Sequence, residues 1–394
     1  MKVFAVLMAV AAAAAVQPRP DASRLIADGV AALHNFEYEE ANDAFRRARA
    51  ADPSRALAYW GEAMSYHQTL WRNEDVAAGR AALARLAPTP QERAAKADTP
   101  RTRALLAAVD ILFGSGDAES RRRRYADAMG AAYREFRSDP DVAAFYALAL
   151  LGTMSRSLIG TGDAHDPALA GSATQQRVGA ILTEVLRAHP RHPGALHYLI
   201  HAYDDPAHAR LALGAARAYA ALAPASSHAR HMPSHVFLQL GLWREAAAAD
   251  RGSYDFSKQW AERKGLGPGM RNYHALSWLQ YELLQRGQYR EARSLIDELQ
   301  WARDGAAGSS AKAPNPILSD WASMRARFAL ETRQWTVLAR EDAFANVNDL
   351  FAIGVSAART GDAARAETVR RALAERSRSE QEGDLRPAIA IMER

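Results

Sequence analysis

Apolar residues recur three and four positions apart along most of the chain, and glycine, proline or short polar runs separate these segments. The spacing indicates amphipathic helices, because residues three or four apart lie on one helix face. Few segments are rich in the β-branched residues that favour strands. Such helical segments lie at 22–55, 102–114, 124–140, 141–154 and 174–190. The pattern therefore predicts a chain that is helical almost throughout.

The helical segments also repeat. Residues 22–55 carry apolar, small and helix-ending residues at fixed places, namely Leu25, Gly29, Ala41, Phe45, Ala48 and Pro53. This stretch resembles the tetratricopeptide repeat (TPR), a helix–turn–helix of about 34 residues, because the six residues match its preferred positions 4, 8, 20, 24, 27 and 32. The next unit starts at Ala56 and repeats the pattern with Tyr59, Ala63 and Tyr66.

The clearest repeats cover residues 22–86, 193–250 and 273–300, and weaker helical hairpins fill the rest. The resemblance implies an all-α, TPR-like α-solenoid over residues 17–394, a right-handed superhelix of helix–turn–helix repeats. Each repeat buries its apolar face against its neighbours, and the stack curves around a concave groove. In the TPR family the first helix of each repeat lines that groove, mainly through positions 2, 5, 9, 12 and 13.

The N-terminus has the pattern of a secretory signal peptide. Lys2 precedes an apolar run from Val3 to Val16, and small residues come before Gln17 and Pro18. We expect residues 1–16 to be removed near Ala15–Gln17, which predicts a periplasmic or secreted protein. The alternative is an alanine-rich N-terminal helix or anchor. After cleavage we expect no membrane span, because no second apolar stretch is long enough.

Charge and composition exclude several classes of site. The net charge is only +5, and the basic run Arg121–Arg124 has acidic neighbours and no interleaved aromatic residues, so we expect no nucleic-acid binding. The chain has no cysteine. This excludes disulfides, cysteine nucleophiles, thiolate zinc sites and iron–sulfur clusters. A metal ion would have to be held by histidine, carboxylate, backbone or water oxygen.

Histidine is concentrated in one part of the chain. Eight of the twelve histidines fall between His189 and His235. Two helical segments each carry a pair four residues apart, His197/His201 and His231/His235, and His228 precedes the second pair. Aligned to the TPR pattern, these five residues occupy groove-lining positions 2, 5 or 9. The same alignment places His274, Asp204, Asp205, His34 and His67 on groove-lining positions.

Helix geometry brings these side chains together. At about 100° per residue, His197, His201 and Asp204 share one helix face, and neighbouring helices lie about 8–10 Å apart. Imidazoles suit a divalent transition metal such as zinc, copper or iron. We therefore expect one metal site with His197, His201, His231 and His235 as its core ligands. Its other candidate ligands are His228, His274 and Asp204, and the secondary groove candidates are His34, His67 and Asp205.

Other interpretations stay open. The histidines could be packing residues, proton carriers, or polar contacts in a TPR scaffold that binds a periplasmic protein or peptide without metal. The sequence does not decide whether the protein is an enzyme. Asp204 and Asp205 could simply form a turn between helices, and Pro233 is expected in the first turn of a helix that begins near Met232.

We expect aromatic residues to pack between helices, namely Trp60, Tyr66, Trp71, Trp243, Tyr273 and Trp278. Surface positions are expected for His165, His189, His192 and His208.

Overall fold

The computed structural model describes residues 21–154, 172–222, 225–306, 316–338 and 346–379, and most of them are helical. The first half contains α1 (Ala22–His34), α2 (Tyr38–Ala51), α3 (Ala56–Met64), α4 (Val76–Leu86), α5 (Pro90–Ala95), α6 (Pro100–Leu112), α7 (Ala118–Glu135), α8 (Pro140–Gly152) and α9 (Ala173–Ala188). The second half contains α10 (Pro193–Ala202), α11 (Ala209–Leu222), α12 (Ser227–Gln239), α13 (Trp243–Arg263), α14 (Tyr273–Gln285), α15 (Tyr289–Ala306), α16 (Pro316–Thr332), α17 (Val347–Thr360) and α18 (Ala363–Ser379). Within the described ranges there are also two short 3₁₀ helices, η2 (Pro268–Met270) and η3 (Trp335–Val337).

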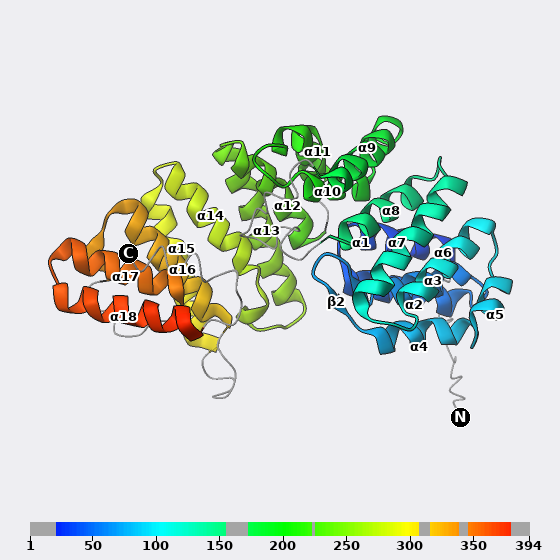
Figure 1. Cartoon of the computed structure of the whole chain (residues 1–394), viewed down its shortest axis with the longest axis horizontal. Coiled ribbons are helices and arrows are strands. Elements are labelled where there is room, and N and C mark those ends of the chain that lie inside the picture. The colour runs from blue at the N-terminus through cyan, green and yellow to red at the C-terminus, as the bar shows by residue number, and fades with distance from the viewer. Residues whose placement is uncertain (1–20, 155–171, 223–224, 307–315, 339–345, 380–394) are drawn as a thin grey trace, which may run out of the picture.

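Most consecutive helices pack against one another, from α1 with α2 to α17 with α18. Figure 1 shows the pairs following one another along the long axis of the molecule, from the N-terminal units to the C-terminal ones. The first helices of successive hairpins also touch, as α8 does with α10 and α10 with α12. The structure confirms the predicted all-α, TPR-like α-solenoid.

One contact joins parts of the stack that are far apart in sequence. Helix α1 packs against α10, although about 160 residues separate them. The largest hydrophobic cluster accordingly runs from α1 to the start of α13, and a second cluster links α13 to α16. The C-terminal end of α1 thereby reaches the first histidine-bearing helix.

The helices begin where capping residues are placed. Asp139 accepts a hydrogen bond from the backbone N–H of Val142 at the start of α8, and Ser226 does the same for Ala229 at the start of α12. His192 caps α10 through its ring, since its Nδ1 accepts from the backbone N–H of Ala195. Each cap satisfies a backbone donor that the first helical turn leaves without a partner.

The first repeats are held by one aromatic side chain between two glycines. Phe45 on α2 is fully buried and lies against Gly29 of α1 and Gly61 of α3. A Cβ atom at Gly61 would come within 2.2 Å of the Phe45 ring, and one at Gly29 within 2.8 Å. Three helices can pack this closely only because both positions lack a side chain.

Two local expectations are wrong. His67 does not line a first helix, because α3 ends at Met64 and His67 pairs with Glu74 in a two-residue antiparallel hairpin of β1 (His67–Gln68) and β2 (Asn73–Glu74). Its side chain is buried beside Phe113. Pro233 lies inside α12, since the Ser226 cap starts the helix at Ser227. The missing N–H of Pro233 removes one helical hydrogen bond, which the packing of α12 between its neighbours tolerates.

In the part of the chain that the structure describes, no helix is both long and apolar enough to cross a membrane. The predicted signal peptide and His165 lie outside the described residues.

We expect Gly61→Ala to destabilise the fold by about 1–3 kcal/mol, because the new methyl group overpacks the Phe45 site. Gly214→Ala is the matched control, since a Cβ atom there meets nothing within 4 Å. Removing that exposed helical glycine is expected to stabilise by about 0.5–1 kcal/mol. Urea unfolding followed by circular dichroism measures both, and equal stability of the two variants would contradict the packing described.

Candidate metal centre on the first-helix face

Six described histidines on α10, α12 and α14, the first helices of their hairpins, form two groups. The inner cluster is His197, His201 and His228, and the outer cluster is His231, His235 and His274. In each group one potential ligand atom per residue lies within 4.8 Å of the others. The expected single site is thus divided into two adjacent sites, because His228 turns toward α10 whereas His231 and His235 turn toward α14.

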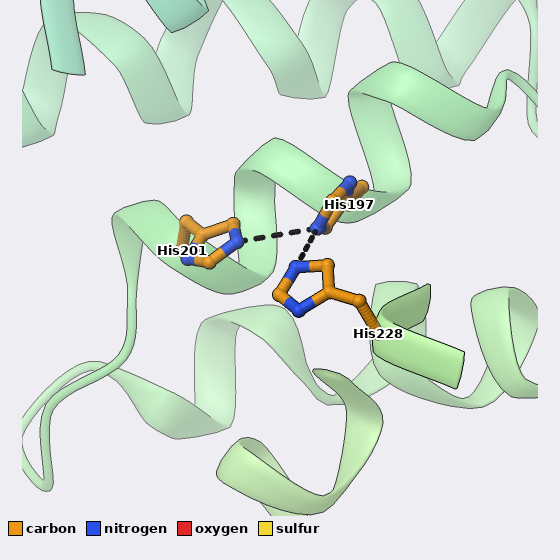
Figure 2. Close-up of side chains that lie close together, drawn as sticks. All are labelled: His197, His201 and His228. Atoms are coloured by element: carbon orange, nitrogen blue, oxygen red, sulfur yellow. Dashed lines mark hydrogen bonds between the residues drawn. The ribbon is translucent and has the colours of Figure 1, made fainter. Parts of the chain in front are cut away.

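In the inner cluster, three ring nitrogens point at one another. His197 and His201 are one turn apart on α10, and His228 reaches them from the start of α12 (Figure 2). The Nε2 atom of His197 lies 3.1 Å from Nε2 of His228 and 3.2 Å from Nε2 of His201. Two nitrogens bound to a tetrahedral zinc ion at about 2.0–2.1 Å would lie roughly 3.4 Å apart. The observed separations are close to that value.

A hydrogen bond at Nδ1, on the side away from the cluster, fixes the orientation of the His197 ring. Its Nδ1–H donates to the backbone carbonyl of His34, 2.7 Å away, at the C-terminal end of α1. Nε2 of His197 therefore carries a lone pair and no proton. One lone pair cannot accept good hydrogen bonds from His201 and His228 together. A cation at the centre would satisfy all three nitrogens at once, and a backbone carbonyl behind a ring is a usual support for a metal-ligating histidine.

Aromatic side chains enclose the inner cluster. The ring of Phe36 lies 4.4 Å from that of His197 and stacks on that of His228, and Tyr219 stacks on the other side of His197. Trp71 packs edge-on against His228 at 4.9 Å. Phe36 has a left-handed backbone, with φ 59, which costs about 1–3 kcal/mol for such a residue. In this conformation the Phe36 ring packs on the rings of His197 and His228.

Burial keeps the inner rings neutral. It lowers the pKa of His197 to about 3, and it lowers the pKa of His201 and of His228 well below the usual value, with further lowering from the neighbouring histidines. Neutral imidazole is the form that binds a metal ion.

The outer cluster has carboxylates behind its rings. Nε2 of His231 and Nε2 of His235 lie 2.9 Å apart, one turn apart on α12. Nδ1 of His235 donates to Asp204 at 2.7 Å, and Nδ1 of His231 donates to Asp250. Both Nε2 atoms then present lone pairs toward each other. His274 on α14 completes the cluster and is exposed to solvent.

A second carboxyl group lies close to Asp250. Asp250 on α13 and Glu282 on α14 are both fully buried, and each carboxyl group acts electrostatically on the other. Burial raises the pKa of Asp250, and burial together with repulsion from Asp250 raises the pKa of Glu282 to about 11. Glu282 therefore holds a proton at neutral pH, and the Asp250 carboxyl group contacts Nδ1 of His231.

A third group, His34, Asp141 and His192, looks similar in composition but differs in its hydrogen bonds. His192 Nδ1 accepts from a backbone N–H, so its Nε2–H donates to Asp141 at 3.2 Å. His34 Nε2–H donates to the same carboxylate at 3.0 Å, and Nδ1 of His34 accepts from Tyr198. Burial alone would raise the pKa of Asp141, but these hydrogen bonds hold that pKa far below the usual value. Every ring nitrogen here already has a complementary partner, so this group joins α1, α8 and α10 without a metal ion.

The other residues that the sequence suggested as ligands or groove candidates, Asp204, Asp205 and His34, lie outside the two clusters. Asp204 lies behind His235 rather than among the ligand atoms, and it also accepts from Gln239. Asp205 accepts from the backbone of Ala207 and His208 and forms the turn before α11. His34 supports His197 from α1 and is not on the open face.

Sequence reasoning missed several contributors. His192 is buried rather than on the surface, whereas His189 is exposed and His208 is half-buried. Trp71 and Trp278 pack on the clusters, Trp278 with its ring 4.5 Å from that of His235. Of these residues, only Asp250 could have been singled out from the sequence, because it is an acidic residue at the end of an alanine-rich helical segment, AAAAD.

A cavity of about 380 Å³ adjoins the inner cluster and has His228 in its wall. Its other walls come from the start of α2, from α13 and from residues before α14, and its aromatic lining consists of Phe36, Tyr38, Phe256 and Trp260. The acidic side chain Glu37 also lines it, with a pKa raised to about 7 by burial and by Glu40. The cavity gives a solvent-side approach to His228.

The sequence matches no protein-family model and no curated protein. Among solved structures it is similar to a tetratricopeptide repeat protein from Parabacteroides merdae, with 9% identity, 94% of this chain and 98% of that chain covered, and a TM-score of 0.37. Yeast Tom70 gives 9% identity, 95% and 88% coverage and a TM-score of 0.32. The P58(IPK) TPR domain gives 14% identity, 94% and 97% coverage and a TM-score of 0.22.

All three are TPR proteins, the kind of protein that the repeat pattern predicted. At such identities and TM-scores, no ligand or partner is transferred to this chain. The description of its fold rests on its own helix packing, and that of its site on its own side chains.

The lowered histidine pKa values predict how the metal-free protein responds to acid. Unfolded histidines titrate near pH 6.5, whereas the buried rings stay neutral in the folded state. Below pH 6.5 the unfolded state therefore binds more protons, and each such ring costs up to about 1.4 kcal/mol of stability per pH unit. We expect the free energy of unfolding, measured in urea with a chelator present, to fall from pH 6.5 to pH 5.

His228→Ala removes one of these rings and should make that fall shallower. His189→Ala, at an exposed position, should leave it unchanged. A free energy of unfolding that stays constant over this range in the wild-type protein would contradict neutral, buried imidazoles.

Proposed function

We propose that this protein binds transition-metal ions through the inner and outer histidine clusters. One observation carries the proposal: ring nitrogens meet at 2.9–3.2 Å while the opposite nitrogens of His197, His231 and His235 are held by hydrogen-bond acceptors. In the outer cluster the Nε2 lone pairs of His231 and His235 face each other and repel unless a proton or a cation lies between them, and burial disfavours the extra proton. In the inner cluster the single Nε2 lone pair of His197 cannot accept good hydrogen bonds from His201 and His228 together, whereas a cation satisfies all three nitrogens.

The donor set selects the class of ion. Each cluster offers three imidazole nitrogens and no carboxylate oxygen among its ligand atoms. Zinc, copper, iron and nickel take such ligands, whereas magnesium and calcium require oxygen. A bound ion of this class would supply Lewis acidity or an electron-transfer centre. The chain's own residues hold the rings: His34 and Asp204 fix two of them by hydrogen bonds, and Phe36 limits access of water to the inner cluster.

The hydrogen-bonded group of His34, Asp141 and His192 serves as an internal comparison. It has the same kinds of residues and similar burial, but its nitrogens alternate as donor and acceptor toward one carboxylate. The two clusters lack such a carboxylate at their centre. This difference supports metal binding at the clusters rather than a purely structural role.

The place of action is part of the proposal. The N-terminal pattern of Lys2 and an apolar run from Val3 to Val16 supports export, so we place the mature protein in the periplasm or outside the cell.

Binding of a protein or peptide is the second candidate function. The cavity beside His228, with its aromatic lining of Phe36, Tyr38, Phe256 and Trp260, favours it. Aromatic walls and a few polar groups are common features of ligand pockets. In that case the histidines would be polar contacts, and no tightly held metal would be found.

Elemental analysis of purified, extensively dialysed protein distinguishes these functions. We expect the wild-type protein to retain zinc, copper or iron. The double variant His201→Ala with His235→Ala should lose it, because one ligand is removed from each cluster. His189→Ala is the matched control and should retain metal.

Circular dichroism and thermal unfolding establish that the variants are folded. A wild-type protein that is metal-free and also fails to bind zinc or copper at micromolar concentrations would overturn the proposal and leave the binding of a protein or peptide. Retention of metal by the folded double variant would likewise exclude these clusters.

A further inference from the structure

The two clusters differ in the charge that surrounds them. Behind the outer cluster, Asp204 and Asp250 accept from the Nδ1 atoms of His235 and His231. Behind the inner cluster, His197 donates to a neutral backbone carbonyl. The Nε2 atom of His197 faces the Nε2 atoms of His201 and His228.

The two clusters also differ in their exposure. The inner rings pack against Phe36, Tyr219 and Trp71, and His197 is fully buried. The outer cluster contains the exposed His274, and Trp278 covers one side of it. Aromatic rings therefore enclose more of the inner cluster, which water reaches from the cavity at His228, whereas the outer cluster is open to water at His274.

Charge and polarity together decide which ion each cluster stabilises. The cost of moving an ion from water to an apolar environment grows with the square of its charge, so a divalent ion costs about four times as much as a monovalent one of equal size. Carboxylates or water offset this cost at the outer cluster. At the inner cluster the acceptor behind His197 is a neutral carbonyl and aromatic rings surround the histidines, so a monovalent ion is favoured.

We propose that the clusters hold different ions, Cu⁺ at His197, His201 and His228, and a divalent ion such as Zn²⁺ at His231, His235 and His274. This inference rests on the proposed function and adds that the two clusters bind different ions. Cu⁺ is the monovalent ion that takes imidazole ligands, whereas sodium and potassium take oxygen. Carboxylate-backed imidazoles, as at Asp204, are the usual ligands of Zn²⁺.

Competition titrations of the whole purified protein test this. Cu⁺ is added under anaerobic, reducing conditions against the chelator bathocuproine disulfonate, and Zn²⁺ is added against a chromophoric zinc chelator. We expect the wild-type protein to bind one ion of each kind at the same time. His228→Ala should abolish tight binding of Cu⁺ and keep that of Zn²⁺, and His274→Ala should do the reverse.

Asp204→Asn keeps the size of the side chain and removes its charge. It should weaken Zn²⁺ binding about 10–100-fold and leave Cu⁺ binding unchanged. Because His228 and His274 are not fully buried, both substitutions leave the core intact. His189→Ala should bind both ions like the wild type.

The outcomes separate the two proposals. Failure of both ions to bind overturns the proposed function as well. Binding of two Zn²⁺ ions, competition of Cu⁺ and Zn²⁺ for one cluster, or equal loss of both ions in Asp204→Asn overturns only the division between the clusters.

Discussion

The hydrogen bonds behind the histidine rings are the constraint on which the site depends. When Nδ1 of a ring is committed to an acceptor, the ring is fixed in orientation and its Nε2 lone pair faces forward. His197 meets this condition through the carbonyl of His34, and His235 meets it through Asp204. The fold sets these acceptors at or just beyond the C-terminal ends of α1 and α10, so the geometry of the lone pairs is a property of the whole stack. A cation between the lone pairs then offsets a repulsion that the fold itself creates.

The solenoid supplies this geometry in two ways. Stacked first helices place one-turn histidine pairs on neighbouring helices, which is the local contribution of the repeat. The contact of α1 with α10 is the long-range contribution, since it brings the His34 carbonyl and the Phe36 ring to the inner cluster. An array in which each repeat contacted only its neighbours would lack that support. The close packing of Phe45 between Gly29 and Gly61 helps to hold α1 in place.

Much of the fold could be predicted from the sequence, because apolar spacing, proline and glycine act locally. The repeat at residues 22–55 and the histidine positions on α10, α12 and α14 follow from such local patterns. The division into two clusters could not, since it depends on how far His228 turns toward α10. The role of Asp250 and the burial of His192 depend on contacts with helices distant in sequence. His67 was misplaced because a short hairpin interrupts the repeat after Met64.

X-ray absorption spectroscopy of the metal-loaded protein tests the central claim most directly, because it reports the atoms around the ion itself. The account predicts a first shell of about three nitrogen neighbours at roughly 2.0–2.1 Å with the scattering pattern of imidazole rings. That pattern should be lost when His201 and His235 are both replaced by alanine. A first shell of oxygen atoms alone, unchanged in that variant, would contradict the account.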